Sequence, residues 1–162
     1  AILDRSAAEA EPIRGTSDGA AFEGFQDADD LLAPVLEVFS RGSYFWLPWE
    51  HVQYLEVSQP KTLRDLLWIP ARVATFDGQL GEVYLPNLYP GTAKSDDDLL
   101  RLGRKTEWLD LGSGITRGLG QKLFLVGDDA KTLLELGEVQ FATTATGAAD
   151  DTASPEQPEG QA

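Results

Sequence analysis

The 162-residue chain contains no cysteine, no methionine and a single histidine, His51. Without cysteine it can form no disulfide, no thiolate nucleophile and no cysteine-ligated zinc site. With one histidine, a metal site that needs two is also excluded, and any nucleophilic triad would have to recruit His51. Nothing in this composition points to an oxidising compartment, so we expect a cytoplasmic protein.

Basic residues are scarce: 13 Lys and Arg stand against 27 Asp and Glu, which gives a formal net charge of -14. Binding to a phosphate backbone depends on Lys and Arg displacing counterions, so we expect no nucleic acid partner. Long apolar runs are lacking as well, and no stretch approaches the roughly 20 residues that a membrane-spanning helix needs. The acidic surface therefore leaves a basic protein surface as a possible partner.

The chain begins at Ala1 and shows no initiator methionine. Its first ten residues are rich in helix formers and are followed by Pro12 and Gly15, so we expect residues 1–18 to be the end of an upstream helix plus a linker. Aromatic and β-branched residues then dominate, which predicts a β-rich domain over residues 19–141. Residues 142–162 contain no large apolar side chain, which predicts a disordered acidic tail.

The fold class expected for the domain is α+β, predominantly antiparallel β with short strands and one or two short helices. Residues 34–39 and 44–47 predict a hairpin around 40–42, and residues 68–76 predict a strand whose Pro70 suggests a sheet edge or an entry point. Further strands are expected at 52–57, 82–85, 106–111, 115–126 and 133–141.

Two segments have helical features. Residues 60–67 open at a proline and could form a short helix or an extended link. Ser95 and the acidic run after it supply an N-cap and a negatively charged first turn for a helix through Arg104, and the basic residues near its end agree with the helix dipole.

Three clustered carboxylates, Asp27, Asp29 and Asp30, are the first candidate for chemistry. Neighbouring carboxylates raise one another's pKa, so the cluster could serve an acid-dependent enzyme. The alternative is a capped turn on a solvated surface before Leu31 and Leu32. We favour the turn, and no catalytic residue is assigned.

A second acidic run, Asp96, Asp97 and Asp98, could bind a hard cation through oxygen ligands. Calcium loops normally spread their ligands around a glycine bend and end in a distant Glu, and neither feature is present. Helix capping explains the run without a metal. We therefore predict no metal and no cofactor, and keep a metal-dependent enzyme as the alternative function.

Four tryptophans and four tyrosines supply enough aromatic surface for a core or for a binding groove. Trp49 and Trp68 lie beside prolines where the strand pattern breaks, and exposed aromatics of this kind are enriched at binding hot spots. Together with Trp46 and Arg64 they are the candidate partner-binding residues.

Several segments, taken in order, resemble the C-terminal region of the ImpE family. They are residues 14–19, 25–39, 44–50, 60–72, 81–86, 88–91, 102–108 and 118–124. The resemblance covers roughly residues 14–141, and members of the family look like a helical, tetratricopeptide-like N-terminal region followed by this α+β region.

The resemblance implies a non-enzymatic accessory role in bacterial type VI secretion. It implies protein partners, namely the small subunit of the contractile sheath and, in some systems, the ATPase that recycles the sheath. The family supplies no catalytic residues that can be carried over to this sequence. The sequence also leaves open a purely structural role, in which the domain stabilises a helical half or an oligomer.

Overall fold

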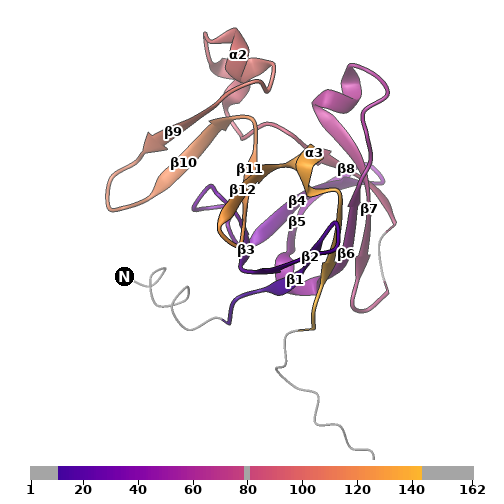
Figure 1. Ribbon diagram of the computed structural model, residues 1–162. Coiled ribbons are helices and arrows are strands. Elements are labelled where there is room, and N and C mark those ends of the chain that lie inside the picture. Colours follow the sequence, from indigo (N-terminus) through magenta and orange to yellow (C-terminus); the bar gives the residue numbers. More distant parts are fainter. Residues whose placement is uncertain (1–10, 79–80, 144–162) are drawn as a thin grey trace, which may run out of the picture.

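The computed structural model describes residues 11–78 and 81–143 of the chain (Figure 1). Its strands are β1 (Arg14–Ser17), β2 (Ala20–Glu23), β3 (Phe25–Asp27), β4 (Val35–Ser40), β5 (Ser43–Pro48), β6 (Val52–Val57), β7 (Trp68–Thr75), β8 (Glu82–Pro86), β9 (Thr106–Asp110), β10 (Thr116–Gly120), β11 (Leu123–Val126), β12 (Asp129–Thr132) and β13 (Glu138–Phe141). The helical segments are η1 (Trp49–His51), η2 (Arg64–Leu66), η3 (Thr92–Lys94), α2 (Asp98–Arg101) and α3 (Leu133–Leu136). This agrees with the expected class of mostly antiparallel short strands with few short helices.

Eight strands form the main sheet, in the order β2-β1-β13-β6-β7-β8-β4-β5. A three-stranded sheet, β12-β11-β3, packs with it around one apolar core, and the β9–β10 hairpin projects from the body as an arm (Figure 1). Along the strands, core residues alternate with outward-facing residues, as is typical of antiparallel sheets with one solvent-exposed face. No helix in the described part of the chain is long and apolar enough to cross a membrane.

The predicted hairpin is present as β4 and β5, paired from Val35 with Pro48 to Ser40 with Ser43. Its two turn residues, Arg41 and Gly42, have φ values of 51° and 80°. Positive φ at both positions is the type I′ geometry that matches the twist of two-residue hairpins. The turn fixes the register, and the register fixes which β5 side chains face outward.

Pro70 lies in an interior strand, because β7 pairs with β6 on one side and β8 on the other. Of the two alternatives predicted for Pro70, the sheet edge was therefore wrong, and its place near the start of β7 agrees with an entry point. The pairing of β6 ends at Val57 with Ala71, and the Pro70 carbonyl accepts a hydrogen bond from the Ser58 amide beyond that end. The missing N–H of Pro70 therefore falls beyond the regular β6–β7 ladder and costs it no hydrogen bond. A proline can be tolerated at such a position even in an interior strand.

The C-terminal strand is shorter than predicted. Residues 133–141 divide into α3 and β13, and the N-cap of α3 is Thr132, whose capping box with Glu135 is complete. Reciprocal capping favours a helical turn despite the strand-like composition. At the other end, residues 14–17, expected in a linker, form β1 between β2 and β13. Of the predicted helix end and linker at 1–18 and the predicted tail at 142–162, residues 1–10 and 144–162 lie outside the described residues.

The acidic helix is also shorter than expected. α2 has four residues, its N-cap is Asp97 rather than Ser95, and Asp97 accepts a hydrogen bond from the Leu99 amide at 2.9 Å. Gly103 follows with φ of 67°, a left-handed conformation that commonly ends a helix.

Candidate functional site

The outward face of the main sheet carries a row of side chains across four strands, three of them aromatic. Pro70 of β7 pairs with Tyr84 of β8, Tyr84 with Phe39 of β4, and Phe39 with Tyr44 of β5. Directly paired residues project to the same face of a sheet, so these side chains form one continuous surface. Tyr84 and Tyr44 are 42% and 50% exposed, which shows that nothing in the described chain covers the row.

A hollow of about 310 Å³ lies at the β7 end of this row, lined by Phe39, Arg64, Trp68 and Tyr84. The Trp68 and Phe39 rings meet edge to face, with centroids 5.8 Å apart and planes at 61°. That geometry is favourable for aromatic pairs and holds the walls of the hollow in place. Two of the four candidate residues, Trp68 and Arg64, are thus brought together at one site.

The η2 segment that carries Arg64 is fixed by hydrogen bonds at both ends. Asp65 is buried and its Oδ2 accepts from the Lys61 and Thr62 amides at 2.9 and 3.2 Å. These bonds, the Lys61 amide first, hold the pKa of the Asp65 carboxyl below its usual value. On the other side, Asn87 Nδ2 donates to the Leu66 carbonyl at 3.0 Å.

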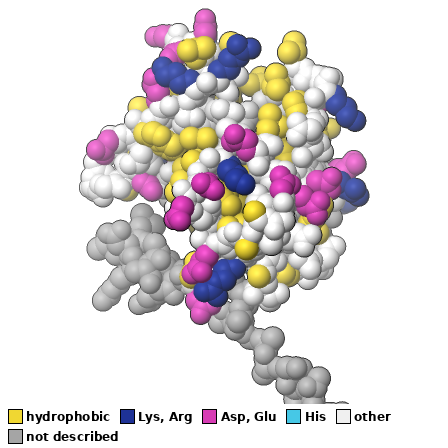
Figure 2. Space-filling view, viewed as in Figure 1, with side chains coloured by type: hydrophobic (Ala, Val, Ile, Leu, Met, Phe, Trp, Pro, Cys, Tyr) yellow, Lys and Arg dark blue, Asp and Glu magenta, His cyan; other side chains and the backbone are white. Residues whose placement is uncertain are grey.

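The same segment exposes three leucines beside the hollow: Leu63 is 84% exposed, Leu66 41% and Leu67 40%. Figure 2 shows hydrophobic side chains gathered beside η2 and, separately, over β9 and β10. Within the described residues, the Arg64 side chain takes part in no ion pair or hydrogen bond. An apolar hollow next to an unpaired guanidinium can receive a large apolar side chain together with a carboxylate.

Trp46 lies further along the same face, on β5, and is 54% exposed. Its Nε1 donates to Tyr44 Oη at 2.8 Å, and Tyr44 donates in turn to Glu37 Oε1. Glu37 is buried in an ion pair with Lys122, which is 2% exposed. The exposed aromatic pair is therefore held by a hydrogen-bond chain that starts inside the protein.

Trp49, the remaining candidate, lies in the core and is 1% exposed. Its ring packs against Phe25, Phe124 and Phe141, with centroid distances of 4.6, 6.0 and 5.8 Å. The proline-interrupted segment around it turns inward through η1. Trp49 thus contributes to packing beneath the sheet and offers no contact surface to a partner.

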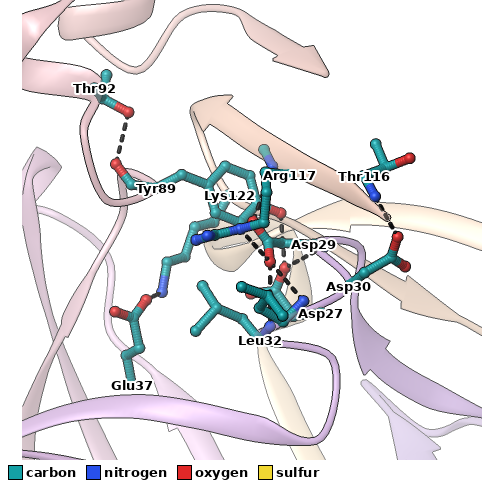
Figure 3. A network of polar contacts seen from close by, with 12 residues as sticks. Asp27, Asp29, Asp30, Leu32, Glu37, Tyr89, Thr92, Thr116, Arg117 and Lys122 are labelled. Atoms are coloured by element: carbon teal, nitrogen blue, oxygen red, sulfur yellow. Dashed lines mark hydrogen bonds and ion pairs between the residues drawn. The ribbon is translucent and has the colours of Figure 1, made fainter. Parts of the chain in front are cut away.

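In the first acidic cluster Asp27 and Asp29 are buried (Figure 3). The turn that was expected there is present, but these two carboxylates do not lie on a solvated surface. Asp29, fully buried, accepts hydrogen bonds from the amides of Leu31, Leu32 and Gly118 and from the Arg117 guanidinium at 2.8 Å. Its carboxylate closes the turn at 29–32 and joins it to β10. The third carboxylate, Asp30, is exposed and accepts from the Thr116 amide at 2.6 Å.

Asp27 is 1% exposed and accepts from the Asp29 amide at 2.9 Å and from Tyr89 Oη at 2.8 Å. Burial raises its pKa to about 6, against the lowering effect of these hydrogen bonds and of the nearby Lys122. Burial also raises the pKa of Tyr89 and lowers that of Lys122 to about 8. An elevated carboxyl pKa suits an acid catalyst, but at this depth the carboxyl of Asp27 contacts only protein groups.

Gly118 permits the close approach of β10 to this network. A Cβ atom built there would lie 2.3 Å from Cε2 of the buried Tyr89 ring, well inside contact distance. Tyr89, Lys122, Glu37 and Arg117 had no signal in the sequence, because their partners are tens of residues away. The glycine was the one local indication that a large group packs against this strand.

Replacing Asp27 by asparagine is expected to change how stability depends on pH. The native pKa of about 6 lies above the ordinary 3.8, so the native state binds the extra proton between these values and is stabilised as the pH falls. From pH 4 to pH 7 the wild type is expected to lose about 2 kcal/mol relative to Asp27→Asn. Denaturant unfolding of both proteins across this range measures it, and parallel pH profiles would contradict the assignment.

The second acidic run is held by cations of the chain itself. Asp97 pairs with Lys105 at 2.7 Å, which holds the pKa of Asp97 low, and Asp98 pairs with Arg101. Among the described residues, no group of three or more His, Cys, Asp or Glu side chains is arranged to hold a metal ion. The run is accounted for by capping and ion pairs.

Three comparisons with known proteins agree with this description. A family model described as ImpE protein matches residues 19–140. The type VI secretion system accessory component TagJ of Pseudomonas aeruginosa is 39% identical over 144 residues, which cover 89% of this chain and 50% of the relative. A crystal structure of a Vibrio parahaemolyticus protein has a TM-score of 0.78 at 26% identity, covering 89% of this chain and 54% of that one.

This chain spans about half the length of both relatives. The family match nevertheless covers most of its described residues, and it includes every segment that carries the resemblance except most of the first, residues 14–19. The expectation drawn from those segments is thereby confirmed. The chain belongs to the ImpE family.

Proposed function

We propose that this chain is a non-enzymatic, cytoplasmic accessory component of a bacterial type VI secretion system that binds a partner protein through the hollow beside η2. The partner we propose is the small subunit of the contractile sheath, with the sheath-recycling ATPase as a second. Family membership and the name of the Pseudomonas aeruginosa relative support the secretion role.

The observation that carries the proposal is the pairing of an exposed aromatic hollow with an unpaired arginine. Trp68 is 42% exposed although its ring is already fixed against Phe39, so a partner can cover it without ordering it first. Arg64 adds a planar donor that favours a carboxylate at the rim. Preorganised aromatic and arginine side chains of this kind dominate binding energies at protein interfaces.

The enzyme alternative has less support. Asp27 and Asp29 are buried, and their carboxylates already accept hydrogen bonds from backbone and side-chain donors. In the second acidic run, at the start of α2, Asp97 and Asp98 are already paired with Lys105 and Arg101. Neither cluster opens onto the hollow, whose lining contains no carboxylate.

Immobilised sheath small subunit is expected to retain this chain at low salt and to retain it less as salt increases, because the Arg64 contact is electrostatic. Arg64→Glu is expected to reduce retention further, whereas Arg14→Glu, a reversal at an exposed arginine on β1, leaves it unchanged. Equal retention of both variants would exclude Arg64 from the interface. Absence of retention at low salt would remove the sheath from the proposal.

A further inference from the structure

The main sheet ends at β5, and the free edge of this strand is open. The two-residue turn makes Ser40 and Ser43 a hydrogen-bonded pair, so the antiparallel alternation places Tyr44 and Trp46 at non-hydrogen-bonded positions toward β4. Their backbone N–H and C=O groups therefore point away from the sheet. Pro48 falls at the next such position, where its missing N–H costs no ladder bond.

Uncovered strand edges are normally protected by charged side chains, proline, bulges or short length. The other strands at sheet edges in the described chain each carry at least one charged residue: Glu23 in β2, Asp27 in β3, Glu107 and Asp110 in β9, Arg117 in β10, and Asp129 and Lys131 in β12. The six residues of β5, from Ser43 to Pro48, include none. Among these edges β5 alone carries no charge, and its one protective feature is Pro48 at its end.

The side chains along this edge are also prepared for contact. Tyr44 and Trp46 are about half exposed, yet the chain of hydrogen bonds from Trp46 through Tyr44 to Glu37 fixes both rings. Lys122 neutralises Glu37 inside the protein, so the aromatic pair presents no net charge at the surface. Rigid aromatic side chains give contact area at little cost in conformational entropy.

We infer that the β5 edge is a second protein-binding site, which accepts an extended segment of another protein as an added strand. Strand addition uses the free backbone groups of Tyr44 and Trp46 for affinity and their rings for side-chain selection. The segment would be uncharged or basic with apolar residues at alternate positions. A second copy of this chain fits less well, because each copy carries a charge of -14 and the copies repel each other.

The inference does not depend on which protein occupies the hollow, so a synthetic strand can test it directly. The probe is a capped hexapeptide of alternating lysine and valine, added to this chain while residue-resolved amide hydrogen exchange is followed by NMR. At about 90% occupancy, exchange at Tyr44 and Trp46 is expected to slow about tenfold, because only the free fraction exchanges. The Phe45 and Leu47 amides, already bonded to β4, are expected to change little.

Two controls separate strand addition from general contact. The same peptide methylated on alternate amide nitrogens keeps its charge and side chains but cannot pair, and it is expected to give no protection. Trp46→Lys is expected to abolish protection at Tyr44, whereas Trp108→Lys, at a tryptophan on β9 that is 42% exposed, preserves it.

Three results would overturn the inference. The first is unchanged exchange at Tyr44 and Trp46 with millimolar peptide, and the second is equal protection by the methylated peptide. The third is protection that rises with protein concentration before any peptide is added, since this would assign the edge to a second copy. Binding of the sheath small subunit is measured separately, so its failure would leave the outcome here intact.

Discussion

Lys122→Met is expected to lower the free energy of unfolding at neutral pH by about 3–5 kcal/mol. Lys122 and Glu37 are 2% and 4% exposed and pair directly, so methionine would leave an ionised carboxylate without its counterion inside the protein. Tyr44 still donates to Glu37 but cannot neutralise it. The destabilisation is expected to shrink at low pH, where the stranded carboxyl can take up a proton.

Equilibrium denaturation of the single and double variants tests this pair. Adding Glu37→Leu to Lys122→Met is expected to recover most of the loss, because a buried ion pair replaced by apolar groups of similar size is often close to neutral. Arg14→Met, which breaks an exposed pair with Glu23, serves as the control and is expected to have little effect. If the double variant were less stable than Lys122→Met, the stranded charge would not be the cause.

Trp68→Ala is expected to weaken binding of the sheath small subunit by about 30-fold or more, the effect of losing a hot-spot side chain. The ring forms one wall of the hollow and is braced by Phe39, so its removal both widens the hollow and frees the Phe39 ring. Because the Trp68 side chain is on the wet face of β7, the effect on stability is expected to be small compared with that on binding.

Titration calorimetry with Trp108→Ala as the matched control measures this effect. Trp108 has the same 42% exposure but lies on the β9–β10 arm, against Tyr89, and lines no part of the hollow. Its replacement is expected to leave the affinity within about threefold of the wild type. A larger loss from Trp108→Ala than from Trp68→Ala would move the interface to the arm.

The hairpin that exposes the β5 edge was predictable because its information is local. Arg41 and Gly42 between two apolar segments specify a tight turn, and the alternation of Ser43 to Pro48 then follows from the pleat. Trp68 was singled out because it lies beside a proline where the strand pattern breaks, and the structure places both Trp68 and Trp46 at outward positions of their strands.

The predictions from local sequence were wrong where contacts between residues far apart in the chain determine the structure. Residues 133–136 have strand-like composition, but the capping box between Thr132 and Glu135 and the packing of Leu133 and Leu136 into the core favour a helical turn. Trp49 was placed at a surface because a proline precedes it. Its neighbours in space, Phe124 and Phe141, are far along the chain, and only the fold reveals that they enclose it.

The carboxylate cluster shows the same limit in its chemistry. Spacing alone suggested a solvated turn or an acid site, whereas Asp29 is satisfied by Arg117 and Gly118 from a strand almost ninety residues away. The hollow likewise combines Phe39 and Tyr84, which were not singled out, with two residues that were. The sequence indicated the segments that line the hollow, but it did not indicate that they come together in space.

The central claim, that the hollow beside η2 is the partner-binding surface, is tested most directly by fluorine NMR. Incorporating 5-fluorotryptophan labels the four tryptophans, which lie at the β5 edge, in the core, in the hollow and on the arm. When the sheath small subunit is added, the Trp68 signal is expected to shift while those of Trp49 and Trp108 stay in place. A shift of Trp108 with an unchanged Trp68 signal would contradict the account.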